Sequence, residues 1–211
     1  MPRQSIRQGL QATMRDVARA AGVSLITVSR AMREPHLVNA ETRRQVERAM
    51  LDIGYVPHMS ARGLVSQRRN IVAAVVPSIN NPVYAATVRG LSDGLRARGM
   101  QLLIGNTDAR PDEEDTVIGA LLAQRPDGIM LTGTTHPPAA RRMLRTAGIP
   151  IVETWSLTRR PLDMIVGFDN REAHAAMARH LVARGYRRFA YVTGPLDQQE
   201  RWRQRLEGFR G

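Results

Sequence analysis

The chain has 211 residues, of which 43% are hydrophobic and only 4% aromatic, so any packed core must be mainly aliphatic. Its formal net charge is +12, and the absence of cysteine excludes a disulfide framework and a thiolate metal site. The first residues lack the apolar stretch of a signal peptide, and the strongest apolar run, residues 71–76, is too short to span a bilayer. We therefore expect a cytoplasmic protein without a membrane partner.

Positive charge is concentrated in the N-terminal third of the chain. Residues 1–69 carry 12 arginines and five acidic residues, whereas residues 70–211 carry 19 arginines and 14 acidic residues. A strongly basic module joined to a domain with less net positive charge favours a polyanionic partner, with nucleic acid the first candidate. A solvated basic surface is the alternative interpretation.

The N-terminal third predicts a basic arm, a small helical domain and a linker. Residues 1–12 form the arm, and residues 13–57 predict three short helices that begin after the N-cap residues Thr13, Ser24 and Asn39. Gly22 permits the turn between the first two helices. Residues 58–70 carry too little apolar surface for a core and are typical of a linker.

From residue 71 onward, short β-rich runs alternate with longer amphipathic stretches. Strands are predicted at 71–76, 101–105, 128–132, 151–153, 164–168 and 189–193, and helices at about 83–98, 112–124, 138–147, 171–184 and from about 199. This alternation predicts an α/β domain with a parallel sheet covered by helices. A binding crevice is expected beyond the carboxyl ends of the strands.

The segment MRDVARAAGVSLITVSRAM, residues 14–32, fits a helix-turn-helix. In that motif the second helix enters the major groove of DNA and its first residues meet base edges. Ser, Thr and Arg side chains suit phosphates and base edges, and Leu25 and Ile26 could contact thymine methyl groups. The alternative is an ordinary helical hairpin in which Leu25 and Ile26 belong to the core.

Three segments, TMRDVARAAGVSLITVSRAM, VNAETRRQVERAMLDIGYVP and INNPVYA, closely resemble the lactose-repressor (LacI/GalR) family of bacterial transcription regulators. The resemblance implies an all-α helix-turn-helix domain followed by an α/β periplasmic-binding-protein-like domain, residues 71–211, and a homodimer on double-stranded operator DNA. It places base reading on Leu25, Ile26 and Arg30. The implied phosphate contacts are Thr13, Ser24, Thr27, Ser29, Asn39 and Tyr55, and the implied minor-groove hinge residues are His58, Ala61 and Leu64.

The same resemblance implies a sugar or sugar-acid effector. The residues expected to border its cleft are Tyr84, Thr132, Glu153, Trp155, Phe168, Asp169 and Arg205. Phe168 and Trp155 could stack on the ligand, and Arg205 could pair with a carboxylate or phosphate. Alternatively, Glu153 forms a structural ion pair with an arginine and Trp155 serves only in packing. The stretches IPIVETW and LDMIVGFDNREA look most like the gluconate-operon repressor branch, which implies gluconate or a related sugar acid.

Family members continue well beyond RWRQRLEGFRG, so we expect a chain truncated in its second subdomain, with a weak or absent effector response. An effector-insensitive DNA binder is therefore an alternative, and a solute-binding protein is a remote one. No GxGxxG, GxxxxGK[ST] or GxSxG motif and no metal-ligand cluster is present in the sequence, so we expect neither an enzyme nor a cofactor.

Overall fold

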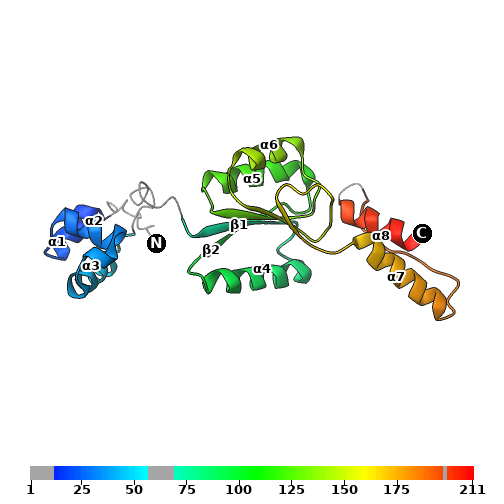
Figure 1. Cartoon of the computed structure of the whole chain (residues 1–211), viewed down its shortest axis with the longest axis horizontal. Coiled ribbons are helices and arrows are strands. Elements are labelled where there is room, and N and C mark those ends of the chain that lie inside the picture. The colour runs from blue at the N-terminus through cyan, green and yellow to red at the C-terminus, as the bar shows by residue number, and fades with distance from the viewer. Residues whose placement is uncertain (1–11, 57–68, 197–198) are drawn as a thin grey trace, which may run out of the picture. The chain divides into compact units, whose positions relative to one another are not determined.

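A computed structural model describes residues 12–56, 69–196 and 199–211 (Figure 1). The chain divides into two compact units, Met1–Gln67 and Arg68–Gly211, and each is described by itself. The basic arm and the hinge residues His58, Ala61 and Leu64 lie outside the described residues.

The first unit contains three short α-helices around a small aliphatic core. They are α1 (Met14–Ala20), α2 (Leu25–Arg33) and α3 (Ala40–Asp52), with a 3-10 turn, η1 (Pro35–Leu37), before α3. Gly22 connects α1 to α2 with φ +63°, a left-handed conformation that glycine adopts without a steric penalty. Val17, Val28 and Val46, one from each helix, are almost completely buried against one another. The helices and the three N-caps expected from the sequence are confirmed.

The second unit is built on a five-stranded parallel sheet with the order β2-β1-β3-β4-β5. The strands are β1 (Ile71–Val76), β2 (Gln101–Asn106), β3 (Gly128–Thr132), β4 (Ile151–Thr154) and β5 (Met164–Val166). Helices α4 (Pro82–Arg96), α5 (Glu114–Ala123) and α6 (Pro138–Thr146) connect them, with a 3-10 turn, η3 (Pro111–Glu113), before α5. The predicted α/β class is confirmed.

Helices cover both faces of this sheet, with α4 on one side and α5 and α6 on the other (Figure 1). Alternate residues of β1 therefore enter different cores: Ala73 packs in the cluster with Ile118 of α5, whereas Ala74 packs in the cluster toward α4. Burial on both faces explains why β1 is a continuous apolar run rather than an alternating one.

Helices α7 (Asn170–Ala183) and α8 (Glu200–Arg210) lie side by side after the sheet (Figure 1). The strand predicted at 189–193 is absent, and this prediction was wrong. A strand requires hydrogen bonds to a neighbour, and no described segment pairs with these residues. Instead, the rings of Phe189 and Tyr191 pack against Phe209 of α8, with centroids 5.9 and 5.0 Å away.

Candidate functional site

In the helical unit, the N-terminus of α1 is fixed by a capping box. The Thr13 hydroxyl accepts a hydrogen bond from the Asp16 backbone N–H at 3.4 Å, and the Asp16 carboxylate accepts one from the Thr13 backbone N–H at 2.9 Å. The Thr13 hydroxyl also donates to that carboxylate at 2.6 Å. This bond, followed by the one from the Thr13 backbone, holds the pKa of the Asp16 carboxyl below its usual value.

The other two helices are capped by single side chains. The Ser24 hydroxyl accepts from the Thr27 backbone N–H at 3.0 Å and lies 2.8 Å from the Thr27 hydroxyl. The Asn39 side-chain oxygen accepts from the Thr42 backbone N–H at 2.8 Å. All three cap residues are exposed, so three of the six implied phosphate contacts coincide with helix N-termini, where backbone dipoles favour an anion.

Helix α2 separates its apolar residues into two sets. Val28 and Ala31 are buried in the core, whereas Leu25 and Ile26 are 42% and 70% exposed. Leu25 and Ile26 are therefore not core residues, and the ordinary-hairpin alternative lacks its main support. Arg30 is exposed as well, and it makes no ion pair within the described part of the chain.

Two further implied DNA contacts differ in exposure. Ser29 is half-buried on α2, next to the buried Val28. Tyr55 follows α3 and its side chain belongs to the helical core, with the residue only 8% exposed. This burial leaves little of Tyr55 accessible to a phosphate.

In the α/β unit, three aromatic rings lie together at the carboxyl ends of the strands. The centroid of Trp155 is 5.6 Å from that of Tyr84 and 6.3 Å from that of Phe168, in edge-to-face arrangements. Trp155 follows β4 and has φ +71°, a left-handed backbone conformation that is costly for a bulky residue. The structure thus brings together three of the seven expected cleft residues.

Asn170, at the start of α7, connects this aromatic group to a fourth expected residue. Its side-chain nitrogen donates to the Trp155 carbonyl at 2.8 Å, and its oxygen accepts from Arg205 Nε at 2.8 Å. The same nitrogen lies 3.4 Å from the Ser156 hydroxyl. Because Asn170 is buried, these bonds orient both Trp155 and Arg205.

A second arginine, Arg201, lies one helical turn before Arg205. The residue is 5% exposed, its Nη2 donates to the Tyr84 hydroxyl at 2.9 Å and to the Gln199 side-chain oxygen at 3.0 Å, and its guanidinium lies 6.0 Å from the centre of the Tyr84 ring. Burial lowers the pKa of the Arg201 guanidinium, and the Tyr84 hydroxyl raises it. The positive charge of Arg205 also lowers this pKa, and the negative charge of Glu200 raises it.

The polar groups of the remaining expected residues are engaged within the fold. The Thr132 hydroxyl donates to the Val75 carbonyl at 2.9 Å, and Asp169 caps α7 by accepting from the Glu172 backbone N–H at 3.0 Å. Glu153 is 1% exposed and accepts from the Leu162 backbone N–H at 2.6 Å. Each of these three side chains thus bonds to the backbone, but Oε1 of Glu153 is buried without a hydrogen-bond partner among the described residues.

Glu153 has a histidine as its neighbour, not the arginine considered from the sequence. Its Oε1 lies 3.3 Å from Nε2 of His136, although the two atoms are not aligned for a hydrogen bond. Nδ1 of His136 lies 2.5 Å from the Glu114 carboxylate on α5. The imidazole is completely buried between the two carboxylates. Within the described residues, no group of three or more His, Cys, Asp or Glu side chains is arranged so that it could hold a metal ion.

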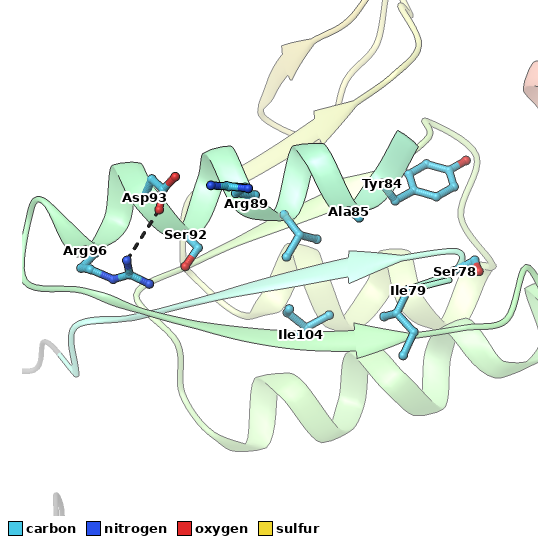
Figure 2. Close-up of a pocket in the computed structure, with 10 residues that line it drawn as sticks. Ser78, Ile79, Tyr84, Ala85, Arg89, Ser92, Asp93, Arg96 and Ile104 are labelled. Carbon is cyan, nitrogen blue, oxygen red and sulfur yellow. Dashed lines mark ion pairs between the residues drawn. The ribbon is translucent and has the colours of Figure 1, made fainter. Parts of the chain in front are cut away.

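A pocket of about 500 Å³ runs along α4 and the edge strand β2 (Figure 2). Tyr84 lies at one end of it, and the ion pair between Asp93 and Arg96, at 3.7 Å, lies at the other. Its wall includes the exposed side chains of Ile79 and Ile104. Of the seven expected cleft residues, Tyr84 alone lines this pocket.

Two family models together match most of the chain. Residues 13–58 match bacterial regulatory proteins of the lacI family, and residues 69–211 match the periplasmic binding proteins and sugar binding domain of the LacI family. The chain belongs to the LacI family. The family assignment and the two-part fold expected from the sequence are thereby confirmed.

Known relatives of this LacI-family chain are longer. The HTH-type transcriptional regulator GntR of Pseudomonas aeruginosa is 41% identical over 94% of the chain, which spans 57% of that relative. A LacI-family regulator from Silicibacter pomeroyi has a TM-score of 0.87 and 39% identity, and the match covers 94% of this chain and 60% of that one. The lac repressor dimer bound to operator and an anti-inducer has a TM-score of 0.73 and 25% identity over 95% of this chain and 61% of that one.

The names of these relatives describe regulators, which agrees with the expectation that the LacI-family chain is not an enzyme. In the part of the chain that the structure describes, every helix is too short or too polar to cross a membrane.

Sequence reasoning missed Arg201, Asn170 and His136 as members of the strand-end assembly. A sequence signal existed for Arg201 alone, because its spacing of four residues from Arg205 places both on one face of a helix.

Proposed function

We propose that the protein is a transcriptional repressor that binds operator DNA through the exposed face of α2. The observation that carries this proposal is the exposure of Leu25, Ile26 and Arg30 on a helix whose opposite face is buried. A recognition helix needs such side chains near its start to reach base edges in the major groove. A protein that binds bacterial operator DNA acts in the cytoplasm, which is therefore the proposed location.

The test is a titration of fluorescent DNA followed by anisotropy. The duplex is first selected from a random library by the protein itself, and its binding is compared with that of a scrambled duplex at two salt concentrations. We expect Arg30→Gln to lose about 1–3 kcal/mol of discrimination between the two duplexes, as for loss of a base contact. The matched control is Arg48→Gln, which removes the same charge from an exposed position on α3. Equal losses in both variants, or no sequence preference in the wild type, would refute base reading by α2.

We also propose that the α/β unit binds a small sugar acid, with gluconate the first candidate. Support comes from the aromatic group of Tyr84, Trp155 and Phe168, from Arg205, and from the resemblance to gluconate-operon repressors. The pocket along α4 is lined by Tyr84 but not by Trp155, Phe168 or Arg205. We assign the effector to the strand ends because charge and ring faces converge there.

Adding gluconate to the DNA titration tests the effector assignment. Release of the selected duplex by gluconate supports an effector-responsive repressor. Binding that is indifferent to gluconate supports the alternative of an effector-insensitive DNA binder, and specific DNA binding would remain established in that case.

We further propose that the protein acts as a homodimer on two half-sites, since two-fold operators match two-fold proteins. The candidate surface is the α4–β2 face, where Ile79, Val83 and Ile104 are exposed beside the unpaired edge of β2. Analytical ultracentrifugation of the wild type and Ile104→Glu tests it. We expect a dimer for the wild type and a monomer for the variant, and a dimer for both would place the interface elsewhere.

A further inference from the structure

We propose that the α/β unit has a DNA-contacting surface of its own, at the edge of the parallel sheet where the strands begin. Five arginines at this edge bind backbone phosphates of the duplex that the helical unit recognises. This inference rests on the DNA-binding function proposed above and adds a second contact surface to it.

An arginine precedes every strand of the sheet. Because all five strands are parallel, their first residues lie along one edge, which we call the amino edge. Each arginine lies between two and six residues before the strand that follows it. In the order of the sheet they are Arg98, Arg69, Arg125, Arg145 and Arg160. Arg69 is half-buried and the other four are exposed.

The fold does not neutralise the amino edge. None of the five arginines forms an ion pair with a carboxylate of the described residues. Two acidic residues also precede strands, but both accept hydrogen bonds from backbone N–H groups. Asp127 accepts from Arg69 and Ile71 at 3.0 and 3.3 Å, and Asp163 accepts from Ile151 at 3.1 Å. These carboxylates connect neighbouring strand starts, and the edge keeps a net positive charge.

Part of the opposite edge of the sheet is acidic. Residues 107–115, which follow β2, contain five acidic residues and a single arginine, Arg110. That arginine is paired with Asp112 and Glu113 at 2.7 and 3.1 Å. The charge therefore changes sign along the direction of the strands, so a polyanion is attracted to the amino edge and repelled by the segment after β2.

Helix stabilisation explains only part of this arrangement. An arginine in the last turn of a helix interacts favourably with the helix dipole, and Arg145 at the end of α6 fits that role. Nη1 of Arg98 donates to the Gly94 carbonyl of α4 at 2.9 Å. Neither Arg69 nor Arg160 follows a described helix, because β1 is the first described element of the unit and β4 connects to β5 without one. Phosphate binding accounts for all five positions, since guanidinium groups match phosphate oxygens.

The amino edge also has a suitable size and attachment. Five strands about 4.8 Å apart span about 19 Å, which corresponds to about six base pairs at 3.4 Å each. The chain enters the unit at this edge, where β1 begins, and residues 57–68 connect it to the helical unit. A segment of this length spans at most about 45 Å. Such a tether gives DNA held by the helical unit a high effective concentration at the amino edge.

The experiment is an anisotropy titration of the full chain with the selected duplex, extended by about ten base pairs at each end, over a series of salt concentrations. The amino-edge variant combines Arg125→Gln, Arg145→Gln and Arg160→Gln. The matched control removes three exposed arginines on and between α7 and α8, by Arg184→Gln, Arg188→Gln and Arg203→Gln. Urea unfolding followed by tryptophan fluorescence checks that each variant is folded.

Each phosphate contact contributes about 0.9 to the slope of log K against the logarithm of the salt concentration. We expect the amino-edge variant to lower this slope by about 2–3 and to weaken binding by roughly tenfold or more at about 0.1 M salt. Its preference for the selected over the scrambled duplex should not change, because phosphate contacts carry no sequence information. The control variant should change the slope by less than about 1.

Equal slopes in the two variants would overturn the proposal, and a sequence preference in the wild type would then still support recognition by α2. Conversely, a wild type without sequence preference would refute that recognition, whereas a slope reduction confined to the amino-edge variant would still support this surface. Polyglutamate tests the other class of polyanion. If the amino-edge variant loses binding of polyglutamate while its DNA slope is unchanged, the edge binds an acidic protein and the proposal is wrong.

Discussion

Shortening Val28 to alanine should loosen the helical unit, whereas shortening Ile26, two residues earlier on α2, should spare the fold and weaken DNA binding. Val28 is 0% exposed, and losing two buried carbons at about 0.8 kcal/mol each, plus the cavity left behind, costs about 2–3 kcal/mol. Ile26 is 70% exposed, and losing three carbons that are less than one-third buried costs about 0.7 kcal/mol on the same scale.

Hydrogen exchange measured on peptides from α3 is the suitable assay, because it reports on the helical unit within the full chain. At a tenfold change per 1.4 kcal/mol, exchange in α3 should accelerate about 30- to 150-fold in Val28→Ala and about threefold in Ile26→Ala. Affinity for the selected duplex should fall in Ile26→Ala. Equal acceleration in the two variants, or unchanged DNA affinity in Ile26→Ala, would refute the division of α2 into a core face and a binding face.

Three other changes test separate features of the fold. Gly22→Ala should destabilise the helical unit by about 1–2 kcal/mol in the same exchange assay. The added Cβ meets no other atom, but the alanine backbone must adopt a left-handed conformation that is unfavourable for it. The Thr13 hydroxyl lowers the pKa of the Asp16 carboxyl from its ordinary 3.8, so the stabilisation by Asp16 is present above that pH and is lost as the pH falls through the lower folded-state value. Exchange of α1 should therefore be faster in Asp16→Asn than in wild type near neutral pH, and the difference should vanish on acidification. His136→Leu removes the hydrogen bond to the Glu114 carboxylate and the polar neighbour of Glu153, and it should destabilise the α/β unit by about 1–3 kcal/mol in urea unfolding followed by tryptophan fluorescence.

Local features of the fold were predictable from the sequence because their causes are local. Thr13, Ser24 and Asn39 each cap a helix through a backbone N–H three residues away, so a short segment contains both partners. The central strands β1 and β3 were predictable because burial on both faces imposes continuous apolar runs. The segment 189–193 has strand-like composition, but pairing depends on residues far away in the sequence, which composition does not reveal.

The same distinction between local and long-range causes applies to the candidate site. The aromatic residues come from separate parts of the chain: Tyr84 lies in α4, Trp155 follows β4 and Phe168 follows β5. The resemblance predicted all three as cleft residues. Arg201 and His136 escaped notice because the sequence does not show that a charged or titratable side chain is buried. Their burial depends on contacts with Tyr84 and Glu153, which come from other elements of the unit.

The left-handed backbone at Trp155 opposes the stability of the fold to the proposed binding of an effector. Glycine would adopt φ +71° without strain, so Trp155→Gly relieves a backbone penalty of about 1–3 kcal/mol while deleting the ring between Tyr84 and Phe168. A screen for heat resistance alone would therefore detect the relief of backbone strain in Trp155→Gly, but it would not detect a loss of the proposed effector binding.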